Sequence, residues 1–356
     1  MNNISTILEK FGFDIETCEI NPLGDGLINK TWIIKETGTG RNFVFQQIND
    51  NVFKRPEDIT FNIRLINDYL NEKHPDYMFT SPVQALDGRD MIKGDDGGYF
   101  RIFKYIEGSV THNELHKPVQ AYEAARQFGK FTNLLSGLNI DQLKTTIPDF
   151  HNLDLRFKQF TESIKNASQS RKNKAKESIS FLSDNQYIAD EYSRITTSMD
   201  FRLRVTHHDT KISNVLFDAK DNGLCVIDLD TVMPGYFISD VGDMLRTYLS
   251  PVSEEEKELD KIEVRIDFFK AIVKGYLSEM KNELSEVEKR SIIYAGKFMI
   301  FMQAIRFITD YLNNDIYYGA KYEGHNLVRG LNQVKLLKLF LDKESQFSEI
   351  VSNELN

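Results

Sequence analysis

The spacing of apolar residues divides the chain into a first part rich in strands and a longer part rich in helices. Up to about residue 108, apolar and polar positions alternate in short runs at 31–35, 42–48 and 98–106, as they do in half-buried strands. The turn Thr37-Gly-Thr-Gly40 separates the first two runs and predicts a hairpin. From residue 117 onward apolar residues recur every three or four positions, which predicts amphipathic helices.

The same pattern predicts the remaining elements. Further strands are expected from Glu19 onward and at 83–86, and helices at 3–11 and 56–73, the latter with Pro56 near its start. The length of 356 residues exceeds one average domain, so one large unit or two lobes are expected. The helices predicted in the second part cover about 118–137, 154–168, 171–196, 255–282, 286–312 and 324–345.

Two short apolar runs enclose a loop rich in ionisable residues. Residues 204–206 are expected to form a strand, the loop follows at 207–214, and a second apolar run, 224–229, ends at two carboxylates. Strands that stop at a polar cluster deliver side chains to a site. The spacing His-x-Asp-x-x-x-x-Asn, with a further Asp 14 residues after the Asn, matches the catalytic loop and metal-binding Asp of protein-kinase-like phosphotransferases.

The residue types in this loop suit phosphoryl transfer. Asp209 can accept the proton of an incoming hydroxyl, and Asn214 and Asp228 offer oxygen ligands for Mg²⁺. The alternative is that Asp209 and Asn214 only form Asx turns, while Asp228 and Asp230 solvate the end of a strand. The histidine and the two flanking strands favour the functional interpretation.

The chain resembles the aminoglycoside phosphotransferase and choline kinase superfamily and, more narrowly, the bacterial N-acetylhexosamine 1-kinases. That resemblance implies an α+β, protein-kinase-like fold with an antiparallel N-terminal lobe at 1–108 and a mainly helical C-terminal lobe at 109–356. It also implies ATP and Mg²⁺ as cofactors and the C1 hydroxyl of GlcNAc or GalNAc as phosphoryl acceptor. The stretches that support it include Gly24-Asp-Gly-Leu-Ile-Asn29, Phe43-Val-Phe-Gln-Gln-Ile-Asn49, Arg101-Ile-Phe-Lys-Tyr-Ile-Glu107, Arg204 to Leu216, Ile227 to Gly235, Asp240 to Arg246, Arg306 to Leu312 and Lys321 to Arg329.

By this resemblance, several residues are expected to hold the nucleotide. Backbone amides of the turn Gly24-Asp25-Gly26 would lie over the phosphates, and the hinge from Tyr105 to Glu107 would hold adenine. An ordinary hairpin and a plain strand ending are the alternatives. Most of the superfamily has a phosphate-pairing Lys on the strand where this chain has Gln46, so charge neutralisation should rest more on Mg²⁺ and on another cation.

The acceptor side is expected at the loop and near the C-terminal helices. Asp209 would orient the acceptor, Lys211 would face the transferring phosphate unless it only forms a surface ion pair, and Asp230 would line the pocket. Arg306 lies in an unusually apolar helix; it either pairs with Asp310 one turn on or, together with Tyr317, binds sugar oxygens.

Three supporting residues complete the expected site. Asp240 and Asp243 are expected, from the resemblance, to hold the catalytic loop in place; a helix N-cap is the alternative for Asp240. His207 is expected to be structural, fixing that loop.

Composition limits the class of protein. The net charge of −9 and the lack of a basic block argue against nucleic-acid binding. Cys18 and Cys225 lie far apart, which indicates a reducing compartment, and cytoplasmic ATP use agrees with this. No apolar run of about 18 residues is evident, so no membrane span is expected. A monomer or weak homo-oligomer is expected.

The alternatives to the sugar kinase are a kinase of the same fold for choline, an amino acid or an aminoglycoside, and a non-catalytic nucleotide-binding pseudokinase.

Overall fold

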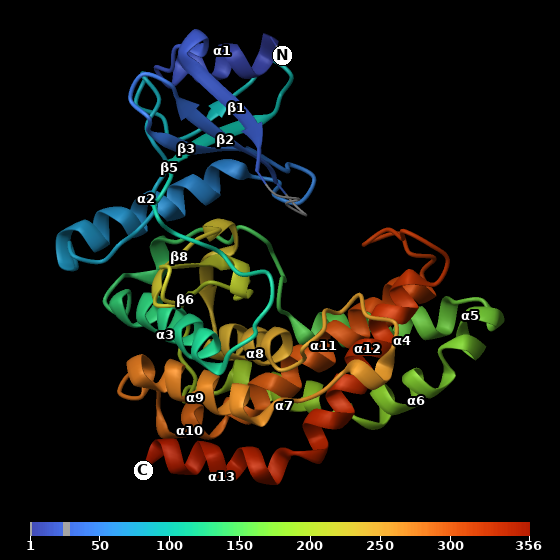
Figure 1. Cartoon of the computed structure of the whole chain (residues 1–356). Coiled ribbons are helices and arrows are strands. Elements are labelled where there is room, and N and C mark those ends of the chain that lie inside the picture. The colour runs from blue at the N-terminus through green and yellow to red at the C-terminus, as the bar shows by residue number, and fades with distance from the viewer. Residues whose placement is uncertain (1, 24–28) are drawn as a thin grey trace.

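The computed structural model describes residues 2–23 and 29–356 and has the two-lobed α+β architecture expected from the sequence (Figure 1). The small lobe contains one antiparallel five-stranded sheet in the order β1-β2-β3-β5-β4. Its strands are β1 (Cys18–Pro22), β2 (Lys30–Glu36), β3 (Asn42–Ile48), β4 (Ile92–Lys93) and β5 (Tyr99–Lys104).

One face of this sheet packs against the first helix, α1 (Asn2–Lys10). Ile7 and Leu8 of α1 form a separate small core with sheet residues such as Phe45 and Ile102. Because side chains alternate along a strand, the neighbouring residues Gln46 and Arg101 point to the opposite face. In Figure 1 that face is turned toward the helical lobe.

The strands at 31–35, 42–48 and 98–106 were predicted correctly, but the strand expected at 83–86 is absent from the described structure. This segment makes a single bridge, between Pro82 and Phe103, and then turns back, with the Ala85 amide donating to the Arg89 carbonyl at 2.8 Å. The Val83 amide still donates to the Ile102 carbonyl of β5 at 2.7 Å, but the amides of Ala85 and Leu86 donate to the carbonyls of Arg89 and Lys10, so no ladder continues.

The helix α2 (Pro56–Lys73) has the predicted bounds and lies between the sheet and the helical lobe (Figure 1). Its buried residues, among them Ile59 and Ile63, join the core of the large lobe. Asn62 is fully buried and donates to the carbonyls of Lys144 (2.8 Å) and Val232 (2.9 Å). These bonds fix α2 to two distant segments of the large lobe.

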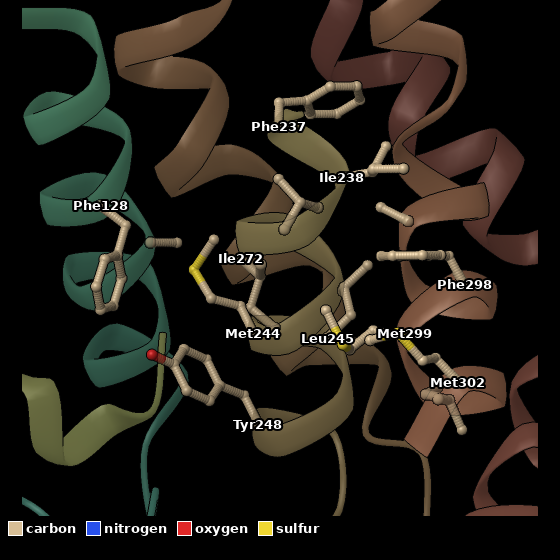
Figure 2. Packing of buried hydrophobic residues seen from close by; sticks show 14 of the residues in the cluster. Phe128, Phe237, Ile238, Met244, Leu245, Tyr248, Ile272, Phe298, Met299 and Met302 are labelled. Atoms are coloured by element: carbon tan, nitrogen blue, oxygen red, sulfur yellow. The ribbon is translucent and has the colours of Figure 1, made fainter. Parts of the chain in front are cut away.

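The large lobe is built around the helix α8 (Phe237–Tyr248). Figure 2 shows Met244, Leu245 and Tyr248 of α8 packed between Phe128 on one side and Phe298 on the other, all fully buried. The surrounding helices are α3 (Pro118–Leu134), α4 (Leu153–Asn166), α5 (Gln169–Lys174), α6 (Lys176–Asp184), α7 (Tyr187–Thr197), α9 (Ile266–Met280), α10 (Glu286–Arg290), α11 (Ile292–Leu312), α12 (His325–Asp342) and α13 (Glu344–Leu355).

Three helices expected from the sequence are shorter or divided. The span 171–196 forms α5, α6 and α7, and the span 286–312 is interrupted at Ser291 to give α10 and α11. The span 255–282 forms a short 3-10 helix at Leu259–Lys261 and the helix α9, which begins only at Ile266. The last predicted helix ends at Asp342, and α13 was not predicted.

The helix α11 is apolar over most of its surface. Its 21 residues make it the one helix in the described part of the chain that is long and apolar enough to cross a membrane. Lys297, Arg306 and Asp310 interrupt it, so it is not the uninterrupted apolar run of about 18 residues that the sequence was expected to lack. Moreover, 72% of its most apolar window is buried inside the large lobe, as in the central helix of a globular core.

Candidate active site

Short strands beneath the small lobe position the polar loop. The strand β6 (Arg204–Thr206) pairs with β9 (Met233–Gly235), and β7 (Val215–Phe217) pairs with β8 (Gly223–Val226). The loop 207–214 connects the two pairs, and Asp228 follows directly after β8. Residues that are separate in sequence are thereby brought to one edge.

The structure brings Asp209, Lys211 and Asn214 into direct contact. The Lys211 ammonium lies 3.0 Å from Oδ1 of Asp209, and the Asn214 amide donates to Oδ2 of Asp209 at 3.2 Å and to its backbone carbonyl at 2.9 Å. Burial opposes the charge on Lys211, but the carboxylates of Asp209 and Asp243 outweigh it and raise the pKa of the ammonium. The Asp209 carboxylate is thus held between two donors, with 17% of its side chain exposed.

Two buried carboxylates on α8 hold the loop from below. Asp240 accepts the backbone N–H groups of His207 (3.0 Å) and His208 (2.7 Å), and Asp243 accepts that of Thr210 (2.8 Å). The predicted support is therefore confirmed. The N-cap alternative is wrong, because the cap position of α8 is Tyr236 and Asp240 already lies inside the helix. Burial raises the pKa of Asp240 to about 7, although its two N–H donors act in the opposite direction.

The two histidines of the loop are buried and structural. The His207 ring lies 2.9 Å from the Ile227 carbonyl, and the His208 ring lies 3.1 Å from the Thr206 carbonyl. His208 has a left-handed backbone (φ 66°), and a Cβ on Gly235 would meet its ring at 2.4 Å. Glycine at 235 is therefore required by the close approach of this ring.

Asp228 has the features of a cation ligand. Its backbone is left-handed (φ 59°, ψ 60°), a strained conformation that turns the chain sharply after β8. Burial raises the pKa of its carboxyl group, and the negative charges of Asp230 and Asp209 raise it further. A cation placed beside Asp228 would relieve this repulsion.

The available ligands fit Mg²⁺ better than a metal held by protein alone. Among the described residues, no group of three or more His, Cys, Asp or Glu side chains is arranged to hold a metal ion. Mg²⁺ is commonly held by one or two carboxylates, with phosphate oxygens and waters completing its octahedron. Asp228 and Asn214 provide a ligand set of this kind.

Asp230 faces the small lobe. Its Oδ1 lies 2.6 Å from Nη2 of Arg101 on β5, and its Oδ2 accepts the Asn29 side-chain amide at 2.7 Å. Gln46 accepts from the same guanidinium, with Nε at 3.1 Å and Nη2 at 2.8 Å. Arg101 and Asn29 were not predicted as site residues; a single arginine within the apolar run 98–106 was the available signal for the first.

The residues predicted to form the nucleotide hinge lie at the connection between the lobes. The Tyr105 amide donates to the Asn42 carbonyl at 3.1 Å, and the Glu107 carboxylate accepts the Asn42 side chain at 2.9 Å. Both residues follow the end of β5, as expected for a hinge. The predicted turn Gly24-Asp25-Gly26 lies outside the described residues.

The acceptor candidates meet near the end of α11. Arg306 donates to Gln303 at 3.2 Å, and its guanidinium lies 5.9 Å and 5.4 Å from the ring centres of Tyr317 and Tyr318. The alternative pair with Asp310 is wrong, because Asp310 instead accepts the backbone N–H groups of Tyr317 (2.7 Å) and Tyr318 (2.9 Å).

Two further basic residues near Arg306 were not predicted. His151 packs 5.3 Å from the His208 ring, and its buried Nδ1 has no hydrogen-bond partner among the described residues. Burial lowers its pKa well below the ordinary value, and the charges of Arg306 and Arg156 add to the effect. Burial lowers the pKa of Arg156 too, and Arg306 contributes.

Comparison with known proteins decides the family. The model of the Phosphotransferase enzyme family matches residues 19–263. The chain belongs to the Phosphotransferase enzyme family. The matched region of this phosphotransferase contains the sheet, the hinge candidates and the whole loop around Asp209.

Solved structures share the fold of this phosphotransferase. An aminoglycoside phosphotransferase from Alicyclobacillus acidocaldarius has a TM-score of 0.64 and 12% identity, over 98% of this chain and 95% of the other. A microcompartment-associated aminopropanol kinase has a TM-score of 0.59 and 14% identity, over 97% and 98%. A Plasmodium vivax ethanolamine kinase has a TM-score of 0.57 and 13% identity, over 93% and 85%. At these identities the likeness establishes the fold alone.

Proposed function

We propose that this phosphotransferase uses ATP and Mg²⁺ to phosphorylate the C1 hydroxyl of an N-acetylhexosamine. The observation that carries the proposal is the contact of Asp209 with Lys211 and Asn214, beside the buried carboxylate of Asp228. This arrangement supplies a proton acceptor, a cation and metal ligands at one edge.

In the proposed reaction the acceptor oxygen forms a bond to the γ-phosphorus, and the bond from that phosphorus to the β,γ-bridging oxygen breaks. Asp209 orients the hydroxyl and accepts its proton, which leaves ADP and a sugar 1-phosphate. Lys211, held at 3.0 Å from Asp209, is close enough to offset charge on the transferred group. Mg²⁺ held by Asn214 and Asp228 would neutralise the phosphates.

The charges around Arg306 support a neutral acceptor rather than a cationic one. Among the described residues, neither Arg306 nor Arg156 forms an ion pair with a carboxylate; their hydrogen bonds go to Gln303, Gln159 and a backbone carbonyl. An amine-rich aminoglycoside would be repelled there, since like charges in a partly buried site cost several kcal/mol. Sugar hydroxyl and acetamido oxygens can accept from these groups.

The aromatic residues at the same place do not form an open cage for a quaternary ammonium. Tyr317 and Tyr318 already have the Arg306 guanidinium within 5.9 Å and 5.4 Å of their rings. Choline would have to displace a cation that is covalently part of the chain. Asp230 remains a proposed acceptor residue, with its carboxylate engaged by Arg101 and Asn29.

Phosphorus NMR tests the proposal directly. The protein with Mg²⁺-ATP would be offered GlcNAc, GalNAc, glucose, galactose, choline and kanamycin in parallel, with Asp209→Asn as the control. We expect a sugar 1-phosphate signal with the N-acetylhexosamines that is lost in the control. If phosphocholine or phosphorylated kanamycin is the main product, the acceptor is a cationic molecule and not an N-acetylhexosamine. ATP bound but intact with every acceptor would favour a pseudokinase.

A further inference from the structure

Arg101 is positioned beside the strand that holds the phosphate-pairing lysine in other kinases. In the antiparallel pair β3–β5, Arg101 is the direct cross-strand partner of Gln46. Opposite residues of such a pair point to the same face, with Cβ atoms about 4.5–5.5 Å apart. Both side chains therefore leave the sheet on the face away from α1, and a long side chain from β5 can reach the space of one from β3.

The surroundings of Arg101 hold its guanidinium in place but leave one of its donor groups without a bond. The residue is 1% exposed, and Nε and Nη2 both donate to Gln46. Nη1 has no hydrogen-bond partner among residues 2–23 and 29–356. A buried donor left unsatisfied costs about 1–3 kcal/mol, and more when it is charged. A phosphate oxygen is a strong acceptor that would remove this cost.

Contacts with the large lobe place the same guanidinium at the boundary between the lobes. Its Nη2 lies 2.6 Å from Asp230, which also accepts from Asn29. Asp230 is two residues beyond the proposed metal ligand Asp228. In kinases of this fold the nucleotide phosphates lie between the sheet and the strand end that holds the metal.

We infer that Arg101 contacts the nucleotide phosphates and supplies the positive charge that a lysine at the position of Gln46 supplies in most of this superfamily. This inference rests on the proposed ATP-dependent function. Gln46 then acts as a positioning residue, because its Oε1 accepts two hydrogen bonds from the Arg101 guanidinium and fixes the orientation of that group. A glutamine suits that task, because a lysine at 46 would repel Arg101 from the same face.

The alternative role for Arg101 is a strut that only joins the sheet to Asp230. The two roles differ in what they do to nucleotides with and without phosphates. A phosphate contact affects ADP and ATP but not adenosine. If Arg101 is a strut, it fixes the shape of the cleft, so its loss changes the binding of ATP, ADP and adenosine alike. Removal of the Asp230 charge would then have the same effect as removal of Arg101.

Calorimetric titration of the full chain with Mg²⁺-ADP and with adenosine separates these roles. For Arg101→Met we expect ADP binding to weaken at least ~10-fold, since loss of a buried charged contact costs several kcal/mol, while adenosine binding stays within about twofold. Arg101→Lys, which keeps the charge, should retain most of the ADP affinity and remains informative if the Met variant does not fold. Asp230→Asn should weaken ADP binding by less than about threefold. Arg41→Met, an exposed arginine on the same lobe, is the matched control.

The double variant Gln46→Lys, Arg101→Met provides a rescue, because it moves the cation from β5 to β3. We expect it to recover ADP affinity relative to Arg101→Met alone. Equal weakening of ADP and adenosine, or an Asp230→Asn variant that matches Arg101→Met, would overturn the inference. These titrations contain no acceptor, so their outcome does not depend on the sugar assignment. If the wild-type chain binds no nucleotide, the proposed ATP-dependent function is contradicted, and this inference is contradicted with it.

Discussion

Two buried aspartates in different helices hold two loops by the same contact. Asp240 of α8 accepts the consecutive backbone N–H groups of residues 207 and 208, and Asp310 of α11 accepts those of residues 317 and 318. Both carboxylates are almost completely buried, at 1% and 3% exposure. The pair of hydrogen bonds is the same in the two regions, but the two loops differ greatly in their exposure to solvent.

The loop above Asp240 is enclosed apart from the side chains of Asp209 and Lys211, which are 17% and 43% exposed. His207 and His208 are buried, Asp243 accepts the amide of Thr210, and the Tyr248 hydroxyl donates to the carbonyl of Thr210. The segment above Asp310 is open. Ile316 is 80% exposed and Tyr317 69% exposed, so beyond the carboxylate most of the surface of both residues faces solvent.

In the proposed function, the enclosed loop carries out the chemistry and the open segment recognises the acceptor. Proton acceptance and metal binding need fixed geometry, and the enclosed loop supplies it. An acceptor-recognition segment that is anchored mainly from below can change its outer side chains with little effect on the core. This explains how one fold can serve several acceptors, and it predicts that damage to the two aspartates will have different consequences.

The largest effect is expected for Asp240→Asn. An asparagine has one acceptor oxygen and an NH₂ group, so one of the two loop amides would face a donor. We expect the free energy of unfolding to fall by about 3 kcal/mol and kcat to fall at least ~100-fold. Urea denaturation followed by circular dichroism measures the first, and Asp190→Asn on the exposed face of α7 should change stability by less than about 0.5 kcal/mol. An unchanged unfolding midpoint would show that the enclosed loop does not depend on this carboxylate.

An intermediate effect is expected from acid on the enclosed loop. Burial lowers the pKa of His208 from 6.5 to about 4, so the unfolded chain binds more protons between these values. Stability from this group is complete above pH 6.5 and is lost as the pH falls toward 4, with about 2 kcal/mol gone at pH 5.

The variant His208→Asn isolates this contribution, since Asn tolerates the left-handed backbone at this position. Between pH 7.5 and 5 it should lose about 2 kcal/mol less stability than the wild type. His116→Asn, at an exposed histidine, should show the wild-type dependence. A variant at 208 with an unchanged pH dependence would contradict the assignment.

The smallest effect is expected for Asp310→Asn. Loosening the open segment should raise the acceptor KM about 10-fold, or about 1.4 kcal/mol, while the KM for ATP stays within about twofold. Steady-state kinetics with each substrate varied in turn measures the separation, with Asp342→Asn at an exposed position of α12 as control. Equal changes in both KM values would mean that the two loops are not independent.

The sequence predicted the enclosed region far better than the open one. The loop 207–214 was predicted because strands, polar residues and their spacing are local in sequence, whereas its support by Asp240 and Asp243 was expected only from the resemblance. The helix α2 was predicted with its bounds because Pro56 and an amphipathic repeat mark it.

What the sequence did not predict depends on contacts between distant segments. The role of Arg101 follows from the register of β3 with β5, and that of Asp310 follows from the path of the chain beyond α11. The position of α10 also depends on a distant contact. Glu288 closes the capping box of Ser285 and at the same time forms a buried ion pair with Arg204 on β6. No periodicity in the helix itself encodes that partner.

The apolar surface of α11 has a consequence for the chain during its synthesis, because this surface can cause aggregation until other helices cover it. The helix packs on α4 and α8, which precede it, and on α12, which follows. While a ribosome is still making α12, one side of a helix that could span a bilayer by length and composition stays uncovered. A fragment that stops before His325 would therefore expose an apolar surface that chaperones or lipid can bind. The residues that pack the core of the finished enzyme are thus the ones that make its unfinished form prone to aggregate.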